Sequence, residues 1–158
     1  MEPSDGFKTF TLLYHFIMAI QGRVSIMGKS YAVIQAQYEF SQSVDETNKP
    51  NSRPKGGTIT FVIPATSDDD QMFYRWMFSK TEVKSGRFEF TVWTHNNRRS
   101  IKTVTFENAY CIGLKDFFNN SDSKLMYTTV TIVAQAITVG QLTDFAVFVN
   151  DWLPNAGG

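Results

Sequence analysis

The chain has 158 residues, of which 42% are hydrophobic, and its 15 basic side chains balance 15 acidic ones. This length favours one domain with a sizeable core, and the neutral charge argues against a nucleic acid or an anionic membrane surface as partner. The single cysteine, Cys111, excludes an internal disulfide and a multi-cysteine zinc site. A lone thiol is typical of a protein that folds in a reducing cytoplasm. No apolar run is long enough to insert into a membrane as a helix.

Residues 1–17 are an N-terminal extension before Met18, which would itself serve as a natural start. Part of this region, TLLYHFIMAI, is faintly similar to the apolar stretch of a signal peptide. The residues before it carry two acidic groups and one lysine, however, and no small-residue cleavage site follows. Three interpretations stay open: a dispensable extension, an arm that packs on a partner, and a targeting segment.

Alternating apolar residues predict strands in the first third of the chain. The pattern in 20–27 and again in 31–40, around a short turn at residues 28–30, indicates a β-hairpin. The second strand is expected to place five side chains on one face: Ala32, Ile34, Ala36, Tyr38 and Phe40. A further strand at 58–63 places Ile59, Phe61 and Ile63 on one side, and Pro64 ends it by removing a hydrogen-bond donor.

Between these strands lies a long polar loop, Asp45–Gly57, with the sequence DETNKPNSRPKGG. A loop of this length inside a compact β-domain is uncommon and is usually either disordered or used for contact. We expect it to be used for contact with another chain. The candidate contact residues are Asp45, Lys49, Pro50, Ser52, Arg53, Pro54, Lys55, Gly56 and Gly57.

One amphipathic helix is predicted after the third strand. Ser67 is a good N-cap, and the acidic residues 68–70 would occupy the first turn, where the helix dipole favours negative charge. An apolar stripe follows, and Lys80 is expected near the far end. This pattern indicates about three turns of helix lying on a sheet. The stripe consists of Met72, Phe73, Trp76 and Met77.

Two further hairpins complete the predicted fold. Strands at 87–93 and 101–106 flank a tip at residues 95–99, and strands at 109–118 and 126–139 are joined by residues 119–123. Together the elements predict a mainly β domain. We expect a small antiparallel β-barrel or sandwich with one amphipathic helix packed on its side.

The sequence offers little for catalysis or metal binding. Cys111 and His95 are residue types that could form a catalytic thiol–imidazole pair, but the sequence indicates no third group that would orient the base. The acidic residues 68–70 lack the spacing of a calcium loop. The basic cluster Arg98, Arg99 and Lys102 beside Trp93 is better explained as a solvated hairpin tip than as a nucleotide groove. We therefore expect no enzyme, no cofactor and no metal.

The strand from Tyr127 to Val139 carries no charged residue on either face. An isolated small domain usually solvates one face of such a strand with Lys or Glu. Long uncharged strands invite pairing with another chain. This pattern predicts a subunit that associates, with identical copies as the simplest partners.

A series of short motifs follows in order along most of the chain. They are Met18, Gly28-Lys29-Ser30-Tyr31, Tyr38-Glu39-Phe40-Ser41-Gln42, Asp45, Lys49-Pro50, Ser52, Pro54, Gly56-Gly57-Thr58-Ile59-Thr60, Trp76-Met77, Lys84-Ser85-Gly86, Phe106-Glu107-Asn108-Ala109-Tyr110-Cys111 and Thr128-Thr129-Val130-Thr131-Ile132. The loop pattern Lys-Pro-x-Ser-x-Pro-x-Gly-Gly, followed by Glu-Asn-Ala-Tyr-Cys, is the most specific combination. In these motifs the sequence resembles the tube-forming Hcp proteins of type VI secretion systems, in the branch found in Bacteroidetes.

The resemblance implies a structural β-barrel subunit with a side helix, assembled as a hexameric ring whose rings stack into a hollow tube. In such a tube we expect the loop Asp45–Gly57 to form the stacking contact between rings. In that family the tube lies inside a contractile sheath, carries a spike, accommodates effectors in its lumen, and is ejected from the cytoplasm without a cleaved signal peptide. The tube domain would span 18–139. The tail, 140–158, is more apolar than a free end and is expected to pack on the barrel or bind a partner.

Two alternatives to this tube subunit stay open. One is a monomeric β-barrel module that binds a small ligand or a peptide. The other is a specialised tube paralogue that carries effectors, with its tail as an adaptor.

Overall fold

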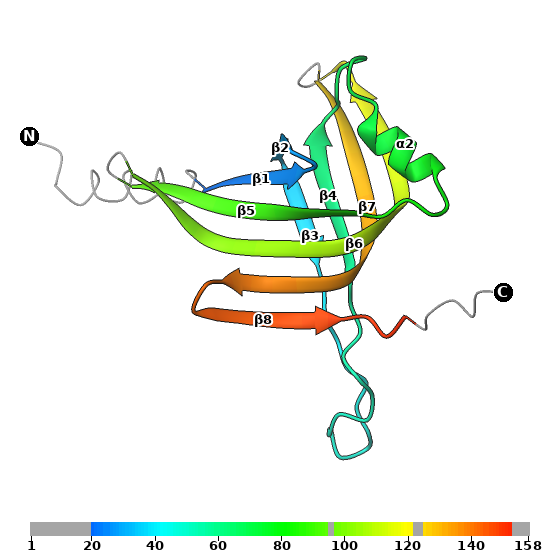
Figure 1. The fold of residues 1–158 in the computed structure, drawn as a ribbon, viewed down its shortest axis with the longest axis vertical. Coiled ribbons are helices and arrows are strands. Elements are labelled where there is room, and N and C mark those ends of the chain that lie inside the picture. The colour runs from blue at the N-terminus through cyan, green and yellow to red at the C-terminus, as the bar shows by residue number, and fades with distance from the viewer. Residues whose placement is uncertain (1–19, 95–96, 122–124, 153–158) are drawn as a thin grey trace, which may run out of the picture.

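The computed structural model describes residues 20–94, 97–121 and 125–152. The predicted fold class is confirmed: an antiparallel sheet curls into a half-barrel, with a short helix at its side (Figure 1). The elements, in chain order, are β1 (Ile20–Ile26), β2 (Lys29–Val33), β3 (Gln35–Tyr38), β4 (Thr58–Pro64), α2 (Met72–Phe78), β5 (Lys84–Thr94), β6 (Asn97–Asn119), β7 (Leu125–Gln141) and β8 (Asp144–Val149).

The strand order is β2-β1-β5-β6-β7-β4-β3, and β8 also pairs with β7. β2 and β3 stand at the two ends of this order, yet only Ile34 separates them in the chain. The N–H of Ile34 donates a hydrogen bond to the carbonyl of Val62 in β4 (2.8 Å). The curled sheet thus brings its edges together, so that the inner faces of its strands share one core.

The first hairpin is confirmed, with a tighter turn than predicted. Met27 and Gly28 connect β1 to β2, and both have positive φ (51° and 77°). Two such residues are typical of a type I′ turn, whose twist matches that of the paired strands. Lys29 consequently already belongs to β2 and pairs with Ile26.

The predicted single strand from Tyr31 to Phe40 is wrong, because the structure has two strands there. β2 pairs with β1, whereas β3 pairs with β4. Tyr31 and Val33 pack against the core from β2, but the inward positions shift to Ala36 after the change of partner at Ile34. Ile34, expected on the same face as Ala36, is exposed.

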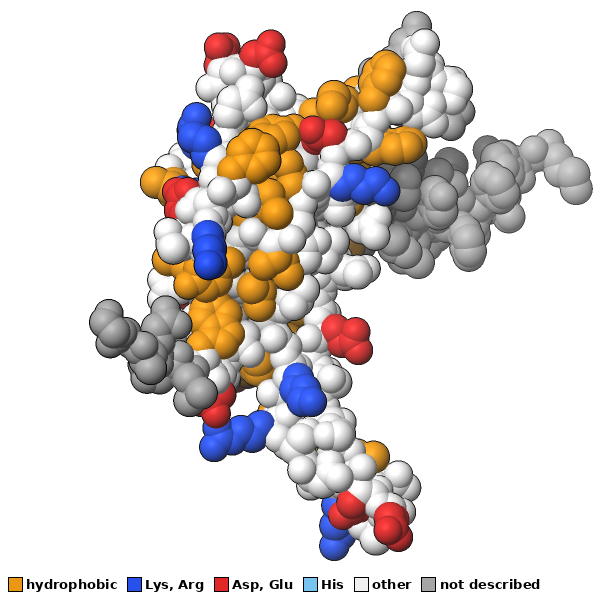
Figure 2. All heavy atoms as spheres, turned by 90° about the vertical axis from the view of Figure 1, so that its right-hand side faces the viewer, with side chains coloured by type: hydrophobic (Ala, Val, Ile, Leu, Met, Phe, Trp, Pro, Cys, Tyr) orange, Lys and Arg blue, Asp and Glu red, His pale blue; other side chains and the backbone are white. Residues whose placement is uncertain are grey.

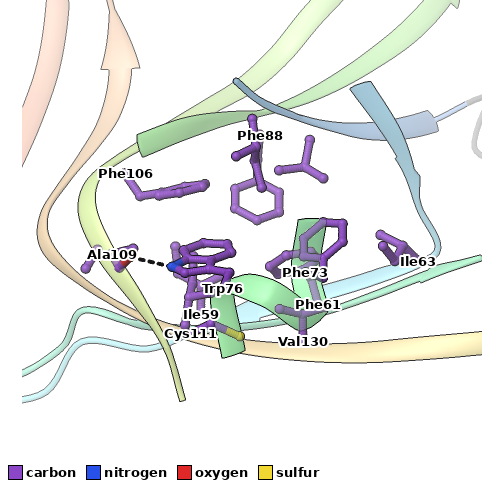
Figure 3. Packing of buried hydrophobic residues seen from close by; sticks show 14 of the residues in the cluster. Ile59, Phe61, Ile63, Phe73, Trp76, Phe88, Phe106, Ala109, Cys111 and Val130 are labelled. Atoms are coloured by element: carbon purple, nitrogen blue, oxygen red, sulfur yellow. Dashed lines mark hydrogen bonds between the residues drawn. The ribbon is translucent and has the colours of Figure 1, made fainter. Parts of the chain in front are cut away.

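The core lies between the inner face of the sheet and α2 (Figure 3). Trp76 is fully buried, and its indole Nε1–H donates to the Ala109 carbonyl (3.1 Å). Phe61 and Phe88 meet edge to face with ring centroids 5.1 Å apart. The predicted inward face of β4 and most of the predicted helical stripe are confirmed as buried; these residues are Ile59, Phe61, Ile63, Met72, Phe73 and Trp76.

Helix α2 begins later and is shorter than predicted. Ser67 is not its N-cap, and no acidic residue lies in its first turn, because residues 68–70 precede the helix. The carboxylate of Asp70 accepts hydrogen bonds from the Tyr31 hydroxyl (2.7 Å) and from the N–H of Met72 (3.2 Å). Asp70 therefore ties the segment before the helix to β2, which delays the first helical turn.

β6 is one continuous strand where two strands were predicted. Asn108 adopts a left-handed conformation (φ 50°), which Asn tolerates better than most residues, and the strand continues past it. The predicted five-residue tip is also wrong, because residues 97–99 pair with residues 92–94 of β5. Residues 95–96 lie outside the described part of the chain.

The tail continues the sheet. Residues 136–141 of β7 pair with β8, which runs back antiparallel along them. Residues 127–133 of the same strand pair with β4. β4 and β8 therefore follow one another along one edge of β7, and the other edge is paired with β6.

Candidate assembly surface

Residues 39–57, called the arm from here on, connect β3 to β4 and project from the barrel at the end away from α2 (Figure 1). The two legs of the arm are joined by backbone hydrogen bonds. Ser41 and Lys55 exchange two of them (3.0 and 2.7 Å), and the N–H of Asn51 donates to the Ser43 carbonyl (2.9 Å). Since every residue from 41 to 51 is exposed, the arm is a folded projection without a core of its own.

The tip of the arm is organised by Asp45. Its carboxylate accepts hydrogen bonds from the Thr47 hydroxyl (2.7 Å), from the Thr47 N–H (2.8 Å) and from the Lys49 N–H (3.1 Å). These bonds, with that of the Thr47 hydroxyl as the largest contribution, lower the pKa of Asp45. Asn48 supplies the positive φ (63°) that closes the turn.

The legs contain most of the predicted contact residues. Pro50 forms an isolated bridge with Val44. The Ser52 hydroxyl accepts from the N–H of Ser43 (2.9 Å) and donates to the Arg53 carbonyl (3.2 Å). Other predicted residues leave their side chains exposed on the legs: Lys49, Arg53, Pro54 and Lys55.

At the base of the arm, the backbone is held tightly against the sheet. Gly57 is buried with φ 98°, and its carbonyl accepts from the N–H of Ala134 (2.7 Å). The side-chain amide of Asn150 donates to the carbonyls of Ala134 (2.7 Å) and Gly56 (3.3 Å). A side chain at Gly57 would lie 2.2 Å from the Asn150 Nδ2 atom, so only glycine fits here.

Two further contacts link the arm to the C-terminal segment. The rings of Phe40 and Phe148 pack with centroids 5.1 Å apart. Arg53 forms an ion pair with Asp151 (2.7 Å), whose largely exposed side chains make it a weak contribution to stability. Phe148 belongs to the apolar tail that the sequence analysis expects to pack on the barrel or bind a partner. Asn150 was missed, because no short-range pattern connects residues so far apart in the chain.

Two open grooves flank the base of the arm. One, of about 730 Å³, lies along β3 and β4 and is lined by Gln37, Tyr38, Glu39, Ser41, Lys55, Gly56, Thr58 and Thr60. The other, of about 510 Å³, lies between residues 53–56 and residues 147–152. Both grooves are open and lined in part by the predicted contact residues, as expected for a surface that receives a neighbouring chain.

Large apolar side chains are also exposed on the body of the protein. Figure 2 shows hydrophobic side chains gathered above the arm, and charged ones along it. On β8, Phe145, Val147 and Val149 alternate along the strand and are 58%, 55% and 63% exposed. An apolar stripe on an edge strand is a typical site of association with another chain.

The uncharged strand 127–139 has two different faces in the structure. One face is buried in the core and includes Val130, Ile132 and Ala134. The other face, with residues such as Thr129 and Thr131, is only half-buried. Core packing therefore accounts for the missing charge on one face, and the lack of charge on the second face still favours contact with another chain.

The structure also describes some of the residues that were considered for catalysis and metal binding. Cys111 is buried near the Met77 sulfur (3.8 Å), and burial raises its pKa to about 11, so it is a poor nucleophile. His95 lies outside the described residues.

Among the residues that the structure describes, no three His, Cys, Asp or Glu side chains form a group able to hold a metal. In the same part of the chain, no helix is long and apolar enough to cross a membrane.

Solved structures share this fold. Hcp1 from Flavobacterium johnsoniae is 24% identical, with a TM-score of 0.71 over 82% of this chain and 99% of that one. Hcp1 from Salmonella typhimurium is 9% identical, with a TM-score of 0.65 over 84% and 95%. The tube-terminating cap of the anti-feeding prophage is 14% identical, with a TM-score of 0.50 over 77% and 88%. No curated protein sequence matches this chain.

A family model described as "Hemolysin coregulated protein Hcp (TssD)" matches residues 18–153. The match covers the arm, the barrel and β8 together. Proteins of this family are structural tube proteins of type VI secretion systems, not enzymes, and they are secreted by those systems. The order of motifs, the curled sheet and the family match agree, and the chain belongs to the Hcp (TssD) family.

Proposed function

We propose that identical copies of this chain close into a hexameric ring, and that the rings stack through the arm into the inner tube of a type VI secretion system. The observation that carries this proposal is the arm itself. It is held in a defined hairpin by backbone hydrogen bonds, yet every residue from 41 to 51 is exposed. A preorganised projection of this kind loses little conformational entropy when it binds.

Ring closure is supported by the apolar surface of the barrel. The exposed stripe on β8, together with the half-buried uncharged face of β7, would be covered by a neighbouring copy. A ring is the closed form of such a heterologous contact between identical chains. Stacking then uses a different part of the molecule, since the arm projects beyond the barrel (Figure 1).

The remaining partners follow from the same role. A contractile sheath would surround the tube, spike and baseplate proteins would meet its end, and effectors would travel in the lumen. Assembly would take place in the cytoplasm before ejection to the outside. In this role the protein needs no cofactor, no nucleic acid and no insertion into a membrane.

Charge reversal on the arm tests the stacking step. Because Arg53 and Lys55 are exposed on one leg, we expect the double variant Arg53→Glu, Lys55→Glu to keep its fold and its rings but to lose stacked tubes. The matched control reverses two exposed charges near α2, Arg75→Glu and Lys80→Glu, and should stack normally. Negative-stain microscopy counts tubes and rings, and light scattering gives the mass of the ring.

Two outcomes would contradict the proposal. Tubes of normal length from the Arg53, Lys55 variant would remove the arm from stacking. A purified chain that stays a single copy at high concentration would contradict the ring and favour a monomeric binding module.

A further inference from the structure

The edge of β7 has a seam where one partner strand ends and the next begins. The last pair with β4 at this end joins Val133 to Thr58, and the first pair with β8 joins Ala136 to Val149. Ala134 and Gln135 lie between these two pairs. The Ala134 N–H already donates to the Gly57 carbonyl, but the carbonyls of Ala134 and Gln135 would need water or another partner if nothing filled the seam.

Asn150 fills this seam. Its backbone N–H donates to the Gln135 carbonyl (2.7 Å), and its side-chain amide donates to the Ala134 carbonyl (2.7 Å). The same amide group reaches across to the Gly56 carbonyl at the base of the arm (3.3 Å). One carboxamide therefore connects β7, the end of β8 and the arm.

The contacts around Asn150 leave the arm little freedom to change direction. Gly57 follows Gly56 in a left-handed conformation, directly beneath the Asn150 amide. Phe40, on the other leg, packs against Phe148 of β8. Both legs of the arm are thus fixed at their bases by residues of the C-terminal segment, while the tip has no such support.

We propose that Asn150 is a positioning residue that sets the direction in which the arm leaves the barrel. This inference rests on the proposed function, because a fixed direction is what allows the arms of one ring to meet the next ring together. The residue acts through two donated hydrogen bonds and not through its volume. An ionised aspartate has nearly the same shape but donates no hydrogen bond.

The test compares Asn150→Asp with the matched surface variant Asn120→Asp in the full-length chain. Hydrogen exchange followed by mass spectrometry reads peptides from 39–57 separately from those of β6 and β7. We expect exchange in the arm to rise about tenfold in Asn150→Asp, because two hydrogen bonds at its base are lost, while the strand peptides stay as in the wild type. Asn150→Ala repeats the measurement without a new charge, in case the aspartate variant fails to fold.

Two results would overturn the inference: unchanged exchange in the arm, or a rise of the same size in arm and strands, which would make Asn150 a general stabiliser. Microscopy of the same samples should show rings without long tubes for Asn150→Asp and normal tubes for Asn120→Asp. Wild-type rings that never stack would contradict the proposed function instead, and the exchange data would still decide the role of Asn150.

Discussion

The barrel and the arm of this protein are stabilised by different interactions. The barrel buries large aromatic side chains such as Trp76, Phe61 and Phe88. The arm buries no such side chain, since its one aromatic residue, Phe40, is partly exposed at its base, and it keeps its shape through backbone pairing and side-chain hydrogen bonds. Burial of apolar surface is the dominant stabilising contribution in folding, so the barrel determines whether the chain folds. The arm is then available for the contacts between chains that we propose.

The largest expected effect comes from removing the centre of the barrel core. Replacing Trp76 with alanine leaves a cavity and removes the hydrogen bond that the indole donates to the Ala109 carbonyl. We expect the free energy of unfolding to fall by about 3–5 kcal/mol, as measured by urea denaturation. The matched control is Phe78→Ala on the same helix, where the ring is 81% exposed and the change should be within about 0.5 kcal/mol. Equal urea midpoints for the two variants would contradict this account of the core.

A smaller effect is expected where the arm meets the barrel. Gly57→Ala places a methyl group 2.2 Å from Asn150 Nδ2 and 2.9 Å from the Ala134 carbonyl, at a residue whose φ is 98°. We expect a loss of about 1–3 kcal/mol in the free energy of unfolding, together with faster hydrogen exchange in the arm.

Gly28→Ala is the matched control for this substitution. Gly28 also has positive φ (77°), but nothing lies within 4 Å of an added Cβ. It therefore reports the cost of backbone strain without the clash. If Gly28→Ala destabilised the protein as much as Gly57→Ala, crowding against Asn150 would have no measurable role.

The barrel was more predictable from the sequence than the way the arm is attached to it. Alternating residues in β4 predicted the inward positions of Ile59, Phe61 and Ile63, because burial of one face imposes a period of two. The arm was visible as an interruption of that pattern by proline, glycine and charge. These features are local, so they can be recognised in a single sequence without knowledge of the fold.

The errors arose where long-range contacts changed a local preference. The acidic residues before α2 have good propensity for a first helical turn, but Asp70 binds Tyr31 of β2 instead. Ile34 falls in an apparently continuous strand, yet the chain changes partner there from β1 to β4. Asn150 gave no signal at all, because its role depends on partners 94 and 16 residues away.

The smallest expected effect is at the tip of the arm, where acid should loosen the turn without affecting the barrel. Hydrogen bonds to Asp45, from the Thr47 hydroxyl first and then from backbone N–H groups, lower its pKa below the ordinary 3.8. A lowered folded-state pKa means that the ionised carboxylate stabilises the turn above the unfolded pKa, and that this stabilisation is lost as the pH falls through the folded value.

An NMR titration from about pH 6 to pH 2 measures this loss at the Thr47 and Lys49 amides, whose resonances should shift together as Asp45 is protonated. In the Asp45→Asn variant the side-chain carbonyl still accepts hydrogen bonds but does not titrate, so the same two amides should stay constant. Methyl resonances of the buried side chains of Ile59 and Ile132 serve as the barrel reference in both proteins. If those moved with the same midpoint as Thr47, the arm and the barrel would be responding as one unit, and the separation between a folding core and a contact-making projection would be wrong.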